Sequence, residues 1–249
     1  MQPITDTWTV PALLLVAALY ASVGQAGATG YIAVLGLAGT DPVPMKLAAL
    51  VLNLLVAGIG SFQFWRVGRL AWRDVYPFAL LGMPFSMLGG ATTLPGTFYF
   101  PIVGLLLVIA AALTMRRGAP QAALQDTTKA AVPFLPALLV GAMIGFVSGT
   151  TGTGGGVFLA PVILAMRWAP IRRVAAVTAV YNLMNSAAAL LGSHAQWSQM
   201  PESIGWWAAA VTVGGVIGAT IGSRLLPDHV MRVVLALLLF ASGLKLMFA

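Results

Sequence analysis

Long stretches without a charged side chain limit the fold of this sequence more than any other feature. Asp, Glu, Lys and Arg are absent from residues 7–40, 47–65, 75–115, 130–166, 174–201, 203–223 and 233–244. A helix needs about 20 apolar residues to span a bilayer, and most of these stretches are at least that long. Only 8% of the 249 residues are charged, against about 25% in a soluble domain. The sequence therefore predicts an all-α polytopic membrane protein and excludes a soluble globular enzyme.

The basic residues fit a membrane protein better than a nucleic-acid-binding protein. The chain carries 13 Lys and Arg against 6 Asp and Glu, and they stand in short clusters between the apolar stretches, as topology signals do. With no cysteine and two histidines, neither a disulfide framework nor a Cys- or His-based metal site is expected. We therefore expect no cofactor, no metal, no nucleic-acid partner and no enzymatic activity. The sequence leaves open whether the chain forms a homodimer in the lipid bilayer.

Glycine interrupts two of the uncharged stretches. Residues 7–40 and 130–166 are too long for one straight helix and too short for two full spans and a turn, and glycines break them at 24–30 and 149–156. Irregular backbone at membrane depth is tolerated where it is buried in protein or lines a cavity. We therefore predict a glycine-broken helical hairpin in each stretch. Single spans are predicted at 47–65, at two places within 75–115 separated by 92–97, and at 174–192, 204–223 and 229–247.

The glycine breaks also indicate an internal repeat. At one constant offset, the glycines at positions 24, 27 and 30 match those at 149, 152 and 155. A short apolar helix, a proline, a basic residue and a long helix containing asparagine follow in both halves. We predict a first membrane repeat (1–117), a cytoplasmic linker (118–132) and a second membrane repeat (133–249), each repeat with a broken hairpin plus three spanning helices.

The positions of arginine and lysine favour an inverted arrangement of the two repeats. By the positive-inside rule, loop 66–74 and the polar stretch 116–132, which holds Arg116, Arg117 and Lys129, should be cytoplasmic. Arg167, Arg172 and Arg173 are then also cytoplasmic if each broken hairpin enters and leaves on the same side. This arrangement puts both termini outside and gives the halves opposite orientations, as in many secondary transporters.

A substrate site is predicted where the two glycine breaks meet. A helix start presents unpaired N–H groups and a partial positive charge, and glycine lets backbone approach a ligand closely. Helices starting near Thr29 and Gly154 would point two such ends into the interior, forming an anion site without a charged side chain. The alternative is that the glycines and asparagines serve only helix packing. The candidate substrate-binding residues are Gln25, Gly27, Thr29, Asn53, Thr150, Thr151, Gly152, Thr153, Gly154 and Asn182.

Charged side chains are expected to lie away from this site. All six carboxylates, Asp6, Asp41, Asp74, Asp126, Glu202 and Asp228, fall in predicted loops. Many ion-coupled transporters use a carboxylate within the membrane, so the sequence does not identify a coupling ion. The basic residues Lys46, Arg172 and Arg173 begin long helices and are expected to steer an anion or orient the protein rather than hold the anion.

These features resemble the sulfite exporter TauE/SafE family of membrane permeases over nearly the whole chain. Residues 152–157, Gly-Thr-Gly-Gly-Gly-Val, are similar to the family's second-half glycine motif. In the first half, Ala28, Thr29 and Tyr31 stand where the second half has Thr153, Gly154 and Gly156. The resemblance implies a secondary transporter in a bacterial-type plasma (inner) membrane. Its substrate would be a small sulfur-containing or organic anion, such as sulfite or sulfoacetate, carried outward; the alternative is an anion channel built on the same hairpins.

Overall fold

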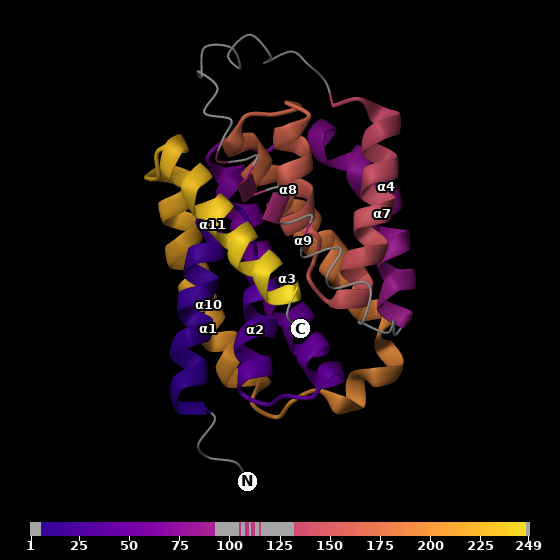
Figure 1. Cartoon of the computed structure of the whole chain (residues 1–249), viewed down its shortest axis with the longest axis vertical. Helices are drawn as coiled ribbons and strands as arrows, with labels where there is room; N and C mark the ends of the chain where they lie inside the picture. Colours follow the sequence, from indigo (N-terminus) through magenta and orange to yellow (C-terminus); the bar gives the residue numbers. More distant parts are fainter. Residues whose placement is uncertain are drawn as a thin grey trace.

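The computed structural model describes residues 6–92 and 132–247, together with positions 105, 108, 109, 111, 112 and 115. Every element in the described residues is a helix, which confirms the predicted all-α membrane fold (Figure 1). Most of loop 92–97, most of the second span within 75–115 and the linker 118–132 lie outside the described residues.

The elements of the first half are α1 (Asp6–Ala21), α2 (Ala28–Leu37), α3 (Pro42–Arg66) and α4 (Trp72–Ala91). Those of the second half are α7 (Phe134–Thr151), α8 (Gly156–Ala165), α9 (Ile171–Gly192), the 3-10 helix η2 (His194–Gln199), α10 (Ile204–Arg224) and α11 (Asp228–Met247). The predicted spans at 47–65, 174–192 and 204–223 correspond to α3, α9 and α10. The short helices α2 and α8 follow the two predicted breaks.

Four helices of the described residues, α3, α7, α9 and α10, are long and apolar enough to cross a membrane by length and composition. Helix α7, which precedes the second break, has 18 residues. Helices α1, α2 and α8 are apolar but shorter. Helices α4 and α11 have 20 residues each but are not among the four.

The two glycine breaks have left-handed glycines at two equivalent positions. In both, the residue before the short helix is a left-handed glycine, Gly27 (φ 96°) before α2 and Gly155 (φ 89°) before α8. Three residues earlier, Gly24 (φ 74°) corresponds to Gly152 (φ 76°). The constant offset predicted from the sequence, which matched Gly24 to Gly149, is therefore wrong by three residues. A spacing of glycines cannot reveal which of them adopt positive φ, because glycine occupies either region readily.

The two halves are interlocked through pairs of helices. Helix α1 packs along α10, α4 packs along α7, and the long helices α3 and α9 contact each other between these pairs. Figure 1 shows α1 beside α10 on one side of the molecule and α4 beside α7 on the other. Each pair joins an element of the first half to one of the second, so the described halves are held together by long-range contacts along whole helices.

Glycine stripes allow these helix pairs to approach closely. A Cβ atom on any of six glycines would overlap a backbone carbonyl of the neighbouring helix; these are Gly141, Gly145 and Gly149 of α7 against α4, and Gly214, Gly218 and Gly222 of α10 against α1. Large side chains of α7 such as Leu139 and Met143 point outward and are exposed. Small residues between helices and large ones toward lipid are typical of membrane helix packing.

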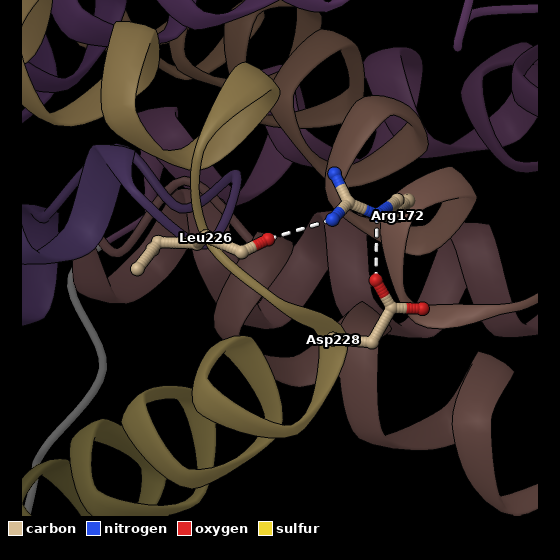
Figure 2. Close-up of polar contacts among 3 residues, drawn as sticks. All are labelled: Arg172, Leu226 and Asp228. Carbon is tan, nitrogen blue, oxygen red and sulfur yellow. Dashed lines mark hydrogen bonds and ion pairs between the residues drawn. The ribbon is translucent and has the colours of Figure 1, made fainter.

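Ion pairs tie the start of α9 to the start of α4 in the first half and to the start of α11 in the second. Arg173 donates two hydrogen bonds to the carboxylate of Asp74, whose side chain is 4% exposed, at the start of α4. Arg172 pairs with Asp228 at 2.6 Å and donates to the Leu226 carbonyl at 2.7 Å (Figure 2). The expectation that Asp74 lies in a loop is wrong: it is a buried residue in the first turn of α4.

Candidate functional site

An asparagine from a neighbouring helix accepts a hydrogen bond from the first residue of each short helix. The N–H of Ala28, which begins α2, donates to Asn53 Oδ1 of α3 at 3.0 Å. The N–H of Gly156, which begins α8, donates to Asn182 Oδ1 of α9 at 2.8 Å. Both preceding residues are glycines without a side chain for capping, so the asparagines satisfy one N–H of each helix start. The next N–H of each first turn, that of Thr29 in α2 and that of Val157 in α8, has no acceptor within its own helix.

The two helix breaks lie against each other in the centre of the molecule. Gln25, in the first break, donates to Thr178 of α9 at 3.4 Å, and a Cβ atom on Gly156 would lie 2.7 Å from its Oε1. The Oε1 atom is buried and has no hydrogen-bond partner among the described residues. Asn53 Nδ2, also of the first half, donates to Ser186 of α9 at 2.7 Å. The predicted meeting of the two breaks is therefore present in the structure.

A small pocket lies between the breaks. In this conformation its gaps are too narrow to hold a water molecule. The residues around it come from both breaks and from the asparagine helices: Tyr20, Gln25, Ala26, Gly27, Ala28, Thr29, Asn53, Thr153, Val157 and Asn182. None of these is charged, so the polar groups facing the pocket are amides, hydroxyls and the starts of α2 and α8.

Six of the ten predicted site residues line this pocket, namely Gln25, Gly27, Thr29, Asn53, Thr153 and Asn182. Gly154 lies directly behind them, since a Cβ atom there would overlap Asn53 and come within 2.9 Å of Asn182 Oδ1. Its φ of 75° also favours glycine.

The other three predicted residues lie at the end of α7, outside the pocket. Gly152 ends α7 in the left-handed conformation. The hydroxyls of Thr150 and Thr151 donate to the Val147 carbonyl within α7 at 2.8 and 2.9 Å. Thr151 also contacts the Thr153 hydroxyl at 2.9 Å, which links it to the pocket indirectly. Helix α8 begins at Gly156 rather than near Gly154 as predicted. Thr150, Thr151 and Gly152 are therefore farther along the chain from the helix start than the prediction placed them.

A cluster of three buried hydroxyls borders the pocket and was not predicted. Tyr20 and Ser242 contact each other at 2.9 Å, Thr29 donates to Tyr20 at 3.1 Å, and Ser242 donates to Thr29 at 3.1 Å. Ser242 lies on α11, far from the glycine breaks in the sequence. Its single hydroxyl in an apolar helix gives no signal of its own, so only the folded chain identifies this cluster.

Comparison with known proteins agrees with this architecture. The family model described as "Sulfite exporter TauE/SafE" matches residues 9–246. A protein of Sinorhizobium fredii (strain NBRC 101917 / NGR234), described as "Probable membrane transporter protein y4hK", is 53% identical over 236 residues, which cover 95% of this chain and 96% of that protein. No solved structure matches the chain. The family and this relative are membrane transporters rather than enzymes, as the sequence predicted. The chain therefore belongs to the sulfite exporter TauE/SafE family of membrane transporters.

Proposed function

We propose that the protein is a secondary transporter that exports a small sulfur-containing or organic anion, such as sulfite or sulfoacetate, across a bacterial-type inner membrane. The observation that carries this proposal is the pairing of two helix starts across one uncharged pocket, each held by an asparagine, Asn53 or Asn182. The substrate class is supported by the family to which the chain belongs, which is described as a sulfite exporter.

The pocket suits an anion through its backbone and neutral side chains. A helix start stabilises a nearby negative charge by about 0.3–1 kcal/mol, and by up to ~2 kcal/mol where partly buried. Two helix starts act on the same pocket, and the hydroxyls of Thr29 and Thr153 and the amide of Gln25 add donors. The affinity expected from such groups is modest, which suits a transporter because the substrate must also be released.

The helix breaks also provide the moving parts of the proposed mechanism. The pocket is closed to water in this conformation, so binding from either side requires the breaks to move apart. Helices α2 and α8 lie in opposite halves of the molecule in Figure 1, and their starts have equivalent glycines. Both features support two inverted repeats that open the pocket to one side and then to the other, by alternating access.

The first test is binding to the purified protein. Thermal unfolding is measured with sulfite, sulfate, thiosulfate, sulfoacetate, taurine and acetate. An anion present at about 100 times its dissociation constant should stabilise the protein by roughly 2.7 kcal/mol. Asn182→Ala should lose the stabilisation given by the effective anion, whereas Gln63→Ala, which removes an amide of α3 outside the pocket lining, should retain it.

The second test is flux in proteoliposomes. A transporter working by alternating access shows trans-stimulation: unlabelled sulfite inside the vesicles accelerates the entry of labelled sulfite. An anion channel on the same hairpins gives flux without trans-stimulation. Absence of both stabilisation and flux for all the anions tested would contradict the proposed function.

A further inference from the structure

Lys46 is a buried cation that has no counter-ion among the residues the structure describes. It lies in the second turn of α3 and is only 9% exposed, and its Nζ donates to the carbonyls of Gly90 at 3.1 Å and Thr92 at 3.5 Å. Among the described parts of the chain no carboxylate pairs with it, whereas Arg172 and Arg173 each hold one. Removing an ammonium from water is costly unless it is paired. An ionisable side chain inside a membrane protein therefore needs a specific explanation.

The side chain of Lys46 lies beside the second helix break. A Cβ atom on Gly152 would be 2.9 Å from Lys46 Cγ, and the neighbouring residue Thr153 lines the pocket. Asn53, which also lines the pocket, follows Lys46 by seven residues and so lies on the same face of α3, about 10 Å along the helix. Lys46 is thus close to the pocket, on the side where α3 begins and α4 ends.

The position equivalent to Lys46 in the other half carries no charge. Gly24 is the counterpart of Gly152 by its backbone conformation, and a Cβ atom on Gly24 would meet Ala175 of α9. The chain therefore places an ammonium at one end of the pocket and an alanine at the other. Packing of the repeated helices does not need the charge, because the equivalent contact is made without it.

We propose that Lys46 forms a second anion subsite, which a small oxyanion occupies on its way between the pocket and the end of the molecule where α3 begins. The inference rests on the proposed transport function. The carbonyls of Gly90 and Thr92 hold the ammonium while the subsite is empty, and the oxyanion supplies the missing negative charge when it passes. The competing explanation is that Lys46 only caps the carbonyls at the end of α4, as basic side chains do at helix C-termini.

A reporter cysteine distinguishes the two explanations, because the chain has no cysteine of its own. Thr150 suits this purpose because it is half-buried and its hydroxyl bonds only within α7. It lies against the end of α4, since a Cβ atom on Gly89 would be 2.9 Å from its nitrogen. The next residue of α4, Gly90, is the one whose carbonyl accepts from Lys46. In Thr150→Cys protein, the rates of reaction are measured with anionic 2-sulfonatoethyl methanethiosulfonate and with its cationic trimethylammonium analogue. The measurement is repeated with Lys46→Gln, with Lys46→Arg and with the matched control Arg224→Gln, which removes an exposed charge at the end of α10.

We expect the ratio of anionic to cationic rates to fall about tenfold with Lys46→Gln, as the loss of one nearby charge predicts. Lys46→Arg and Arg224→Gln should keep the ratio of the parent. Methanesulfonate should slow the anionic reagent in the parent and much less in Lys46→Gln. If the ratio of anionic to cationic rates is the same in the parent and in Lys46→Gln, the subsite is overturned and Lys46 serves only as a helix cap.

The result remains decisive if Lys46→Gln does not fold, as judged by thermal unfolding. Protection by methanesulfonate in the parent and in Lys46→Arg then supports the subsite, and its absence in both overturns it. Trans-stimulated sulfite flux by the parent protein reports separately on the proposed function. If the ratio of anionic to cationic rates depends on the charge at position 46 but no flux is seen, the subsite stands and transport of sulfite is rejected. If flux is seen but the ratio does not depend on that charge, only the subsite is rejected.

Discussion

At the scale of single residues, the candidate site depends on hydrogen bonds between helices. Asn53 and Asn182 each accept from the first N–H of a short helix, and both asparagines are almost completely buried. A buried donor that loses its acceptor costs the full desolvation of that group, about 1–3 kcal/mol. The two asparagines therefore determine both the stability of the helix starts and the shape of the pocket between them.

Substitution of Asn182 by alanine should destabilise the protein by about 1–2 kcal/mol, because the N–H of Gly156 then has no acceptor. Reversible unfolding in mixed micelles measures this loss. Gln63→Ala removes an amide that bonds to Thr220 outside the pocket lining, so we expect a smaller change there. Equal effects of the two substitutions would show that the bond to Gly156 has no special role.

Gly154 should tolerate no side chain. Its φ is 75°, and a Cβ atom would overlap the amide of Asn53, so both Gly154→Ala and Gly154→Val should abolish anion binding and transport while folded protein remains in the membrane. Gly205→Ala is the matched control, since a Cβ atom there meets nothing within 4 Å in the first turn of α10. Normal flux by Gly154→Val would indicate that this glycine serves packing alone.

At the scale of helices, two kinds of contact fix the arrangement around the site. Glycine stripes bring α7 against α4 and α10 against α1 at backbone contact, where dispersion and close packing replace the hydrophobic effect that operates in water. The ion pair of Arg173 with Asp74 joins the start of α9 to the start of α4. These contacts hold the outer helices in place, whereas the short helices α2 and α8 pack mainly on the central helices α3 and α9.

Breaking the ion pair of Arg173 should affect stability far more than anion affinity. Arg173→Gln leaves the buried carboxylate of Asp74 without its partner, a change that costs about 3–5 kcal/mol for a fully buried pair and less here because Arg173 is partly exposed. The dissociation constant of the anion should change less than tenfold, or 1.4 kcal/mol. Unfolding and binding measurements on Arg173→Gln check both statements. Arg172→Gln, which breaks the more exposed pair with Asp228, is measured for comparison. A large loss of affinity at unchanged stability would place Arg173 in the substrate path.

At the scale of the whole molecule, the proposed mechanism requires the two halves to be inverted and yet interlocked. The pairs α1 with α10 and α4 with α7 each pack a helix of the first half along a helix of the second. The pocket lies where both breaks meet. In the proposed inverted arrangement, each side of the membrane would have one short helix through which the pocket opens.

The inverted arrangement makes a direct prediction for side-specific labelling. Single cysteines at Thr40, after the first hairpin, and at Ser198 in η2 should react with an impermeant thiol reagent on intact cells. Cysteines at Arg69, between α3 and α4, and at Met166, after the second hairpin, should react only after the membrane is opened. The pair Thr40 and Met166 is decisive, because a parallel repeat would label both positions from the same side.

Much of the fold followed from the sequence by itself. The uncharged stretches predicted an all-helical membrane protein because a bilayer admits no unpaired backbone polar group and fixes the length of a span. The glycines predicted the two breaks, and the motif at 152–157 indicated the family. Six of the predicted site residues line the pocket for the same reason: a break buried among apolar helices must lie next to the polar groups that satisfy its backbone.

Only the tertiary structure decided which groups meet. It showed the acceptors of the first N–H groups of α2 and α8, the glycines with positive φ, the contact of Ser242 with Tyr20 and Thr29, and the burial of Asp74 and Lys46. These contacts join residues of different helices, and their existence depends on the rotation and depth of each helix within the bundle. An apolar sequence specifies that a helix lies in the membrane, but the direction in which each polar side chain points is set by the packing of the helices against one another.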